Sequence, residues 1–523
     1  MNHAERTTMT RRYAVVVAAV CALVAGLAVI SPAPVGVFWD DGVYLITAKA
    51  LATGEGYRYV HLPGAPSASH FPPLWPALLS IVWRIAPDFP DNVRLMKLVN
   101  PILLAIGAGA TVVLASHVTR VRAWLAALVV VAVMSVAPFL MLSSVVMSEP
   151  LGLALAAPAL VFATRIVMRG RDRDAVWAGV FTGLAILARS ACIALIPALL
   201  VSVCWKRSRR AGIIASGIAV ALALPWFVWS SAHAHELGPA LVGSYGPYGS
   251  WAIDAYVRDP GLMLAVIGKN LVSAPRDFAV VLFGGFPPAM RMYFVVPFIA
   301  MCAVGVACGG RRIAPVFVAL VVYTALVIVW PYAPGRFLWA MFPVYAVACI
   351  AATVTLSRFV RRRFKTARSA LITRYPVPLL FSVLALAMVI RYDVRGFQRG
   401  WHGFAIDQLA NDVVGPVGWI ARNTAPTDTI ASDVHLMTYL YADRIGVPLN
   451  LLTVEEYIRP KTVGVMRAEL AAVDSAFHPR WWIATGSVPQ GRALVAWASE
   501  PATTLVPVAN LPNGGLAART VTR

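Results

Sequence analysis

The feature that most constrains this chain is a succession of long apolar runs separated by short basic segments. Of its 523 residues, 59% are hydrophobic and 13% are charged, whereas charged residues make up about a quarter of a soluble domain. A helix needs about 20 apolar residues to cross a bilayer. Several of the runs have that length, so the sequence predicts a mainly α-helical, polytopic membrane protein.

The basic residues are concentrated in the short segments between the runs. Six segments hold 21 of the 45 Lys and Arg in 49 residues with only three acids: 1–12, 117–122, 169–174, 206–210, 310–312 and 358–374. The tail from 393 to 523 has eleven bases and eleven acids. Such an uneven distribution is typical of cytoplasmic loops. This distribution argues against nucleic acid as the partner of this basic chain. It predicts that the protein lies in the cytoplasmic (inner) membrane with its N-terminus on the cytoplasmic side.

The apolar runs predict about eleven transmembrane helices. The expected spans are 13–31, 97–116, 123–142, 150–168, a pair within 175–205, 211–230, 292–309, 313–332, 337–357 and 376–392. The pair is expected because 175–205 lies between two basic segments, and its corner falls at 188-ARSA-191. The run from 13 to 30 is long for a cleaved signal, so we expect a retained helix.

Three polar parts then lie outside the membrane, and two domains follow. Residues 1–392 are expected to form the transmembrane domain, with a first external loop at 32–96 that carries interfacial helices and a second large external loop at 231–291. Residues 393–523 are expected to form a small extracytoplasmic α/β domain. Within it the patterns predict helices at 407–426 and 434–444 and strands at 428–433, 481–486 and 503–511.

Carboxylates at the external ends of the runs are candidates for proton transfer. Asp40 and Asp41 follow the first span and precede a helix-like stretch with Tyr44. A partly shielded carboxylate can accept a proton from a hydroxyl, although either aspartate could equally cap the following helix. Glu149, in the turn between the third and fourth spans, has the same two interpretations.

Cationic residues at outer helix junctions are candidates for anion binding. Arg189 and Arg336 both lie in mostly apolar surroundings, where an arginine is costly unless it has a function. Guanidinium groups bind phosphate in a bidentate manner. Interfacial snorkelling is the alternative for Arg336. His61 and His70 in the first external loop could also contact phosphate, although an isolated loop histidine is more often merely solvated.

The second external loop contains two weaker patterns. The stretch 243-GSYGPYGSW-251 offers Tyr245, Tyr248 and Trp251, which could stack on a sugar or rest at the membrane interface. The stretch 233-HAHE-236 has a metal-like spacing, but we expect no metal there. All six cysteines lie in apolar runs, so no disulfide framework is expected in the polar parts.

Taken in order, these motifs resemble those of the GT-C glycosyltransferases, multi-span enzymes that use polyprenyl-phosphate sugars. That class includes the protein mannosyltransferases and the aminoarabinose transferases of lipid A. The segments that carry the resemblance are WDDGVY at 39–44, HFPPLWPALL at 70–79, SEP at 148–150, 179-GVFTGLAILARSACIALIPALL-200, LPW at 224–226, PGRFLWAMFP at 334–343, WIARNTAPTDTIASD at 419–433 and YLYADR at 439–444.

The resemblance implies roles for individual residues. Asp40, or else Asp41, takes the place of the base that activates the acceptor, and Glu149 takes the place of a second external acid. Arg189 and Arg336 take the places of the phosphate-binding cations. His70 stands where relatives often have a stronger base. The second external turn lacks the DxD of some relatives, so a divalent cation, with Asp40 and Glu149 as its ligands, is left open.

The function expected from the sequence is therefore that of an integral-membrane glycosyltransferase. It would move a sugar from a polyprenyl-phosphate donor to a glycan, lipid or protein acceptor on the extracytoplasmic face, with inversion. The alternatives are a transporter or flippase of lipid-linked sugars and a non-catalytic protein of the same fold. Against transport, the sequence has no pair of Gly/Pro-broken spans in matching halves.

Overall fold

The chain divides into two compact units, each built from three separate stretches. The computed structural model describes residues 3–283, 287–307, 310–363, 394, 396, 398, 400–486, 488–500 and 503–521. Unit 1 comprises Met1–Ile30, Lys97–Pro225 and Val266–His402, and unit 2 comprises Ser31–Met96, Trp226–Ala265 and Gly403–Arg523. The expected span 376–392 lies outside the described residues.

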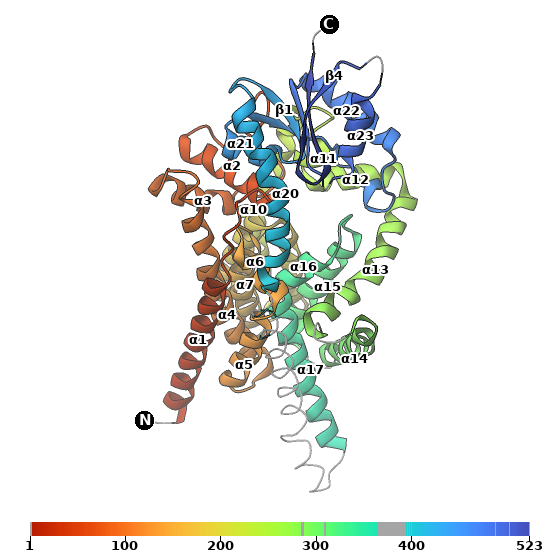
Figure 1. Cartoon of the computed structure of the whole chain (residues 1–523). Coiled ribbons are helices and arrows are strands. Elements are labelled where there is room, and N and C mark those ends of the chain that lie inside the picture. Colours follow the sequence, from red (N-terminus) through yellow and green to blue (C-terminus); the bar gives the residue numbers. More distant parts are fainter. Residues whose placement is uncertain are drawn as a thin grey trace. The chain divides into compact units, whose positions relative to one another are not determined.

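Unit 1 is helical. Its elements (Figure 1) are α1 (His3–Ala28), α4 (Val93–Thr119), α5 (Ala123–Met134), α6 (Ala137–Ser144), α7 (Glu149–Arg169), α8 (Asp172–Ala188), η1 (Ser190–Ala194), α9 (Leu195–Leu200), η2 (Val201–Cys204), α10 (Arg209–Ala232), α13 (Pro260–Phe283), α14 (Pro288–Ala307), α15 (Ala314–Val329), α16 (Gly335–Ala340) and α17 (Phe342–Arg363). α10 and α13 each continue beyond the limits of the unit.

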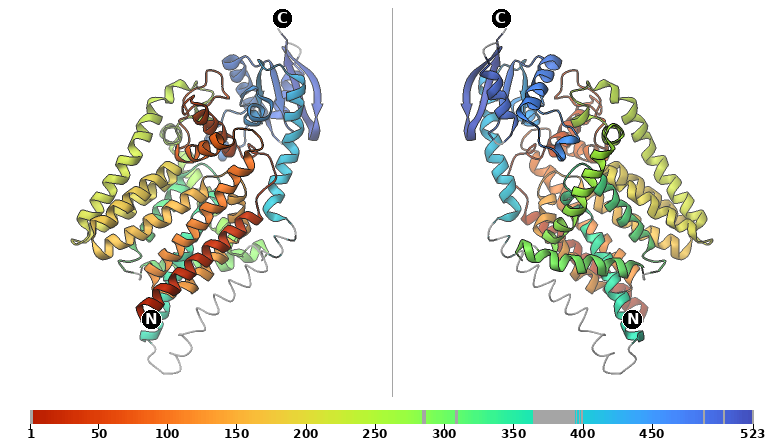
Figure 2. Two further views of the ribbon diagram at one scale, coloured as in Figure 1. Left: turned by 90° about the vertical axis from the view of Figure 1, so that its left-hand side faces the viewer. Right: turned by 90° about the vertical axis from the view of Figure 1, so that its right-hand side faces the viewer.

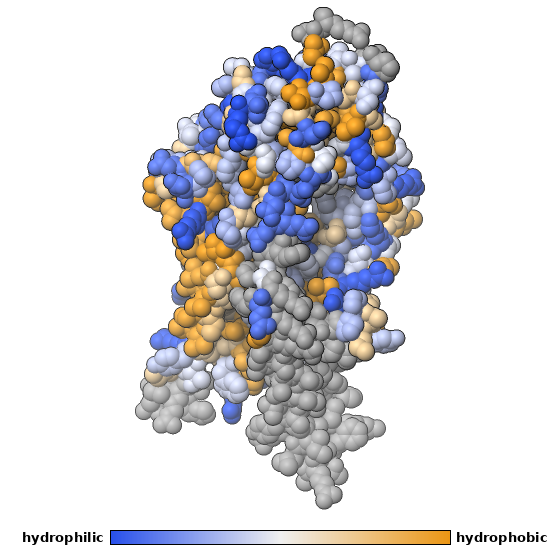
Figure 3. Space-filling model, viewed as in Figure 1, coloured by the Kyte–Doolittle hydropathy of each residue, from blue (hydrophilic) through white to orange (hydrophobic). Residues whose placement is uncertain are grey.

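Several of these helices have membrane-spanning character. Among the described residues, four helices are long and apolar enough to cross a membrane, and five are if the bent pair α5 and α6 is one span. Shorter apolar helices, such as α15, accompany them. Figure 3 shows an apolar band over α1 and α4. The side chains of Val17 and Val24 on α1 and of Ile102 on α4 are exposed. The multi-pass membrane character is confirmed, whereas the number of eleven spans stays a prediction.

Small residues on α4 allow close packing with its two neighbours. A Cβ atom added at Gly109 would lie 3.2 Å from Val15 of α1, and one added at Gly107 would lie 3.1 Å from Leu153 of α7. In membranes, helices associate through such close approaches, because lipid offers no hydrophobic driving force. Figure 2 shows the three helices running in one tilted direction.

The chain breaks where the sequence predicts a corner. α8 ends at Ala188, Arg189 is extended with φ −152° and ψ 121°, and η1 begins at Ser190. A short helical run continues from there to Cys204, and the crossing of the membrane by both parts of the expected pair stays a prediction. By contrast, α13 is a helix of 24 residues within the segment expected as the second external loop. Three charged residues interrupt the apolar pattern of α13, so the sequence does not predict a membrane span there.

Unit 2 combines helices with a small sheet. Its elements are α2 (Asp40–Thr53), α3 (Leu74–Ile85), η3 (Ala234–Glu236), α11 (Val242–Tyr245), α12 (Tyr248–Arg258), α20 (Trp401–Asn423), β1 (Thr429–Ser432), α21 (His435–Ala442), β2 (Ile445–Val447), η4 (Glu455–Tyr457), α22 (Val463–Phe477), β3 (Trp481–Ala484), α23 (Gln490–Ala498), β4 (Leu505–Leu511), η5 (Pro512–Gly514) and β5 (Gly515–Thr520).

The sheet has the strand order β2-β1-β3-β5-β4. β1 pairs in parallel with β2 and β3, and β5 pairs antiparallel with β3 and β4. Ile430 of β1 and Ile483 of β3 are fully buried in one cluster with Ile420 of α20. A helix packed on a mixed sheet in this way confirms the α/β character expected for the tail.

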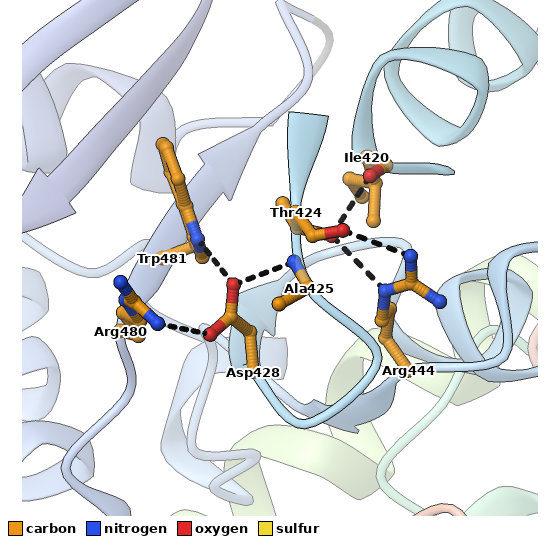
Figure 4. Close-up of polar contacts among 7 residues, drawn as sticks. All are labelled: Ile420, Thr424, Ala425, Asp428, Arg444, Arg480 and Trp481. Carbon is orange, nitrogen blue, oxygen red and sulfur yellow. Dashed lines mark hydrogen bonds and ion pairs between the residues drawn. The ribbon is translucent and has the colours of Figure 1, made fainter. Parts of the chain in front are cut away.

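A polar network fixes the loop that enters the sheet (Figure 4). The Asp428 carboxylate accepts hydrogen bonds from the Ala425 N–H at 2.8 Å, Arg480 Nη1 at 2.8 Å and Trp481 Nε1 at 2.9 Å. These donors lower the pKa of Asp428 although partial burial opposes them. The start of β1 is thereby held against the start of β3. Beside it, Arg444 Nη2 donates a hydrogen bond of 2.9 Å to the carbonyl of Thr424, the residue that follows the end of α20.

Candidate functional site

The candidate site residues fall into two groups, one in each unit. The arginine group in unit 1 contains Arg189, Arg336 and Glu149. The aspartate group in unit 2 contains Asp40, Asp41 and the residues around them.

In the arginine group, one buried carboxylate binds two guanidinium groups. Glu149 Oε1 lies 2.9 Å from Arg189 Nη1 and 2.8 Å from Arg336 Nε. The Glu149 side chain is 2% exposed, that of Arg189 10% and that of Arg336 31%. Two positive charges meet one negative charge, so the group retains a net positive charge to which an anion would be attracted.

The local folds around Arg189 explain how it reaches Glu149. Glu149 is the first residue of α7, and Arg189 follows the last residue of α8. The Arg189 side chain crosses α7 at Gly152, where an added Cβ would lie 2.8 Å from Arg189 Cδ. Arg189 Nη1 also donates to Ser148 Oγ at 3.0 Å. A larger residue at position 152 would push the side chain out of this path.

Arg336 is positioned by a residue that sequence analysis did not single out. It is the second residue of α16, and the preceding Gly335 N–H donates a hydrogen bond to the Asp277 carboxylate of α13. Trp339 Nε1 adds a hydrogen bond of 3.4 Å to the Asp277 carbonyl. Asp277 therefore holds the start of the short helix that carries Arg336. Nothing local in the sequence could have linked residues so far apart.

In the aspartate group, Asp41 is an internal anchor. Its side chain is 1% exposed and accepts hydrogen bonds from the N–H groups of Gly36 at 2.9 Å, Phe38 at 3.1 Å and Gly42 at 3.0 Å. Burial raises the pKa of Asp41 to about 6, although these three donors oppose the rise. The carboxylate thus holds the loop in front of α2.

That loop contains a strained turn at Trp39. Trp39 has φ 63° and ψ −60°, and the Asp40 N–H donates to the Phe38 carbonyl at 2.7 Å. This is a γ-turn with a positive central φ, which is rare and costly for a bulky residue. Such strain is found mainly at functional sites. Asp40, which follows as the first residue of α2, is half-buried.

Aromatic rings surround this turn within unit 2. The Trp39 ring lies 5.7 Å from the His70 ring and 5.5 Å from the Tyr245 ring, measured between centroids. Tyr44 is 3% exposed, and its ring lies 4.7 Å from that of Phe71. Trp39 and Phe71 are the residues of this set that sequence analysis missed.

The structure gives His70 a different environment from the one that phosphate binding requires. His70 is 3% exposed, its Nδ1 lies 2.7 Å from the Gly246 carbonyl, and its ring lies 3.6 Å from the Tyr248 ring. Burial lowers the pKa of His70 to about 4. The imidazole is therefore neutral at pH 7 and brings no positive charge to a phosphate.

Tyr245 is likewise an internal residue. It is 0% exposed, and its hydroxyl lies 2.8 Å from His61 Nε2 and 2.5 Å from His435 Nε2. No face of its ring is open to a sugar, so the expected stacking role does not suit this position. The hydroxyl instead joins the first external loop, the second external loop and the tail.

The remaining candidates in the second loop are less deeply buried. Tyr248 and Trp251 are half-buried on α12. The Trp251 ring packs against a small core formed by Ala255, Leu262 and Val454. Glu236 of the HAHE stretch accepts hydrogen bonds from the Ser67 N–H at 2.7 Å and the Ser67 hydroxyl at 3.0 Å, so its carboxylate serves to fix the first loop.

The divalent cation that the sequence leaves open, with Asp40 and Glu149 as its ligands, stays a prediction. Glu149 already shares one oxygen between two guanidinium groups, and a cation there would be repelled by both. Within the described residues, no cluster of three or more His, Cys, Asp or Glu side chains could hold a metal ion.

Comparison with solved structures identifies the fold. ArnT from Cupriavidus metallidurans bound to undecaprenyl phosphate aligns over 98% of this chain and 98% of its own, with a TM-score of 0.52 and 14% identity. The Archaeoglobus fulgidus oligosaccharyltransferase tethered to an acceptor peptide aligns over 98% of this chain and 74% of its own, with a TM-score of 0.54 and 13% identity.

Both structures are GT-C glycosyltransferases. The chain therefore has the GT-C fold, as the sequence resemblance implies. Neither a protein-family model nor a curated protein sequence matches it.

Proposed function

We propose that this chain is an integral-membrane glycosyltransferase that moves a sugar from a polyprenyl-phosphate donor to an acceptor hydroxyl on the extracytoplasmic face. The observation that carries the proposal is the pair of arginines held by the single buried carboxylate of Glu149, within a GT-C fold. The binding of undecaprenyl phosphate by a structural neighbour supports the lipid class of the donor.

The arginines would bind the donor phosphate. When the glycosidic bond breaks, the sugar–phosphate bond electrons pass to the phosphate oxygen, whose negative charge grows. Guanidinium groups already fixed by Glu149 stabilise that charge without reorganising. Glu149 is thus a positioning residue that fixes both guanidinium groups for the donor phosphate.

Asp40 would accept the proton from the acceptor. The acceptor oxygen attacks the anomeric carbon, the bond to phosphate breaks, and the hydroxyl proton passes to the Asp40 carboxylate. Attack from the side opposite the leaving phosphate inverts the anomeric centre. Asp40 is preferred over Asp41 because Asp41 is buried and already accepts three backbone hydrogen bonds.

The test is release of undecaprenyl phosphate from a panel of labelled undecaprenyl-phosphate sugars by the reconstituted protein. Asp40→Asn should reduce release by about 10²–10⁴-fold, the usual contribution of a general base. Asp88→Asn, which changes an exposed acid of the same unit, is the matched control. Cleavage that survives Asp40→Asn contradicts the base assignment. Movement of labelled lipid between leaflets without cleavage would show a transporter instead.

A further inference from the structure

A second group of cations in unit 1 has no part in the proposed reaction. Arg11 Nη2 of α1 lies 2.9 Å from His117 Nδ1 of α4. Arg165 and Arg169 of α7, together with Arg312 before α15, lie within electrostatic reach of the same imidazole. Arg120 and Arg358 act on Arg312 in turn. We call these seven residues the basic cluster: Arg11, His117, Arg120, Arg165, Arg169, Arg312 and Arg358.

The basic cluster has little internal compensation. Within the part of the chain that the structure describes, none of its six arginines forms an ion pair with a carboxylate. Arg165 Nε is buried without a hydrogen-bond partner. Arg358 Nη2 reaches only the Thr119 carbonyl, at 3.4 Å. Like charges gathered from five parts of the chain repel one another, so the arrangement calls for an anion.

The position of the basic cluster indicates the kind of anion. Arg11 lies near the start of the apolar stretch Met9–Ala28, His117 lies at the end of Val93–Thr119, and Arg169 ends Glu149–Arg169. Three helices long enough to cross a membrane thus place their ends in one cluster. The ends of such helices lie at the level of lipid headgroups.

We propose that the basic cluster binds the phosphodiester headgroup of an anionic phospholipid, with phosphatidylglycerol as the simplest example. Guanidinium groups match phosphate oxygens in a bidentate manner. Basic pockets between transmembrane helices on the cytoplasmic side are known to hold anionic headgroups. The buried Arg165 Nε–H, which has no hydrogen-bond partner among the described residues, can donate a hydrogen bond to a phosphate oxygen. This lipid would serve as a bound structural ligand, separate from the donor lipid.

Lipid titrations of the detergent-solubilised full-length protein, read by native mass spectrometry, test the proposal. The probes are phosphatidylglycerol, phosphatidylcholine with the same acyl chains, and free glycerol phosphate. The wild-type protein should bind phosphatidylglycerol at least about tenfold more tightly than either of the others. The variant Arg165→Gln/Arg169→Gln/Arg312→Gln should lose about a hundredfold of that affinity, since each basic residue near an anionic lipid contributes about fivefold.

The matched control removes three positive charges from neighbouring basic segments outside the basic cluster. Arg171→Gln/Arg173→Gln/Arg209→Gln changes exposed arginines of the same unit and should lower the affinity by less than about fivefold. An equal loss in this control would show general attraction and overturn the site.

Two further outcomes would also overturn the proposal. Equal wild-type binding of phosphatidylglycerol and phosphatidylcholine would remove the headgroup preference, and this comparison requires no variant to fold. Glycerol phosphate that binds as tightly as phosphatidylglycerol would assign the basic cluster to a soluble phosphate rather than a lipid.

Discussion

Trp39 lies in a strained turn directly before the proposed base, Asp40, and Asp41 anchors this turn. The positive φ at Trp39 costs about 1–3 kcal/mol, and the three hydrogen bonds to Asp41 hold the turn in place. Asp41→Asn replaces one carboxylate oxygen by an amide donor and should let the turn relax. We expect kcat to fall at least about tenfold with little change in the KM for the donor, because the arginines are untouched. Steady-state kinetics measure both quantities.

A double-mutant cycle separates this positioning role from general destabilisation. Glycine adopts a positive φ without strain, so in a Trp39→Gly background the turn should depend less on the hydrogen bonds to Asp41. The loss caused by Asp41→Asn should be smaller there than in the wild type. Equal losses in the two backgrounds would show that Asp41 does not act through the turn.

Gly152 offers a test of the arginine group at a position that touches no substrate. In Gly152→Ala, the new Cβ would lie 2.8 Å from Arg189 Cδ, and the side chain must move although its guanidinium is tied to Glu149 and Ser148. Donor-lipid affinity should fall by about tenfold, equivalent to about 1.4 kcal/mol. Binding of undecaprenyl phosphate followed by tryptophan fluorescence measures the change.

Gly217→Ala on α10 is the matched control, because nothing lies within 4 Å of the Cβ that it adds. Alanine favours a helix over glycine by about 1 kcal/mol, so this variant should bind donor normally and unfold at a slightly higher temperature. Normal donor affinity in Gly152→Ala would mean that the path of Arg189 over α7 does not matter for binding.

At the residue scale, sequence reasoning found candidates but not their partners. Arg189 and Arg336 are predicted from their apolar surroundings and Glu149 from its place in an external turn, yet no local pattern could show that one carboxylate binds both guanidinium groups. The choice between Asp40 and Asp41 was open, because neighbouring residues differ in burial only once the loop is folded. Burial also removed Tyr245 from the sugar-contact candidates.

At the scale of elements, strong apolar or β-branched patterns were predictable. The corner before η1, β1, β3 and β4 were all expected close to where they occur. α22, α23 and β5 were missed, because they are short or rich in alanine and lack a clear period. α13 was hidden by Lys269, Arg276 and Asp277, of which Asp277 is used to hold α16.

The buried histidines that join the segments of unit 2 predict sensitivity to acid. Burial lowers the pKa of His435 to about 4 and that of His61 well below its ordinary value. An unfolded histidine binds a proton near pH 6.5. Between about pH 6.5 and 4 the unfolded chain therefore binds more protons than the folded chain, and stability falls as pH falls. For His435 the loss amounts to about 3 kcal/mol over that window.

Thermal unfolding of the wild type and of His435→Asn between pH 7.5 and 4 measures this effect. The variant should be less stable at pH 7.5, because it lacks the contact with Tyr245, but should lose less stability on acidification. His235→Asn, at an exposed position, should follow the wild-type curve. Asp41 has the opposite effect on the pH dependence of stability, since its pKa is raised in the folded chain. This contribution is the same in the wild type and the variants, so it cancels when their curves are compared. Parallel curves for the wild type and His435→Asn would rule out the imidazole as the cause.

At the scale of the whole molecule, the sequence predicts the membrane character of the chain more readily than its division into two units. Two segments expected as external loops supply Ser31–Met96 and Trp226–Ala265, which join the tail in unit 2. Contacts such as that of Tyr245 with His61 and His435 create this grouping. They connect residues more than 180 positions apart, for which a single sequence carries no signal.

The orientation of the chain is the last prediction, and it follows from the distribution of charge. Basic segments remain on the cytoplasmic side, so Lys206 should be inside and the balanced tail, with Ser499, should be outside. Both residues are exposed. In a background with all six cysteines replaced by alanine, a membrane-impermeant maleimide should label Ser499→Cys in spheroplasts. Lys206→Cys should be labelled only after permeabilisation.

The labelling pattern also tests on which side of the membrane each proposed lipid site lies. If Lys206→Cys reacts without permeabilisation and Ser499→Cys does not, the orientation is reversed and the proposed reaction would face the cytoplasm. Labelling of both positions in intact spheroplasts would mean that an even number of crossings, rather than the expected odd number, separates Lys206 from the tail. In the expected orientation the basic segments meet the negatively charged inner leaflet, where each arginine near the surface gains about 1 kcal/mol from anionic lipid.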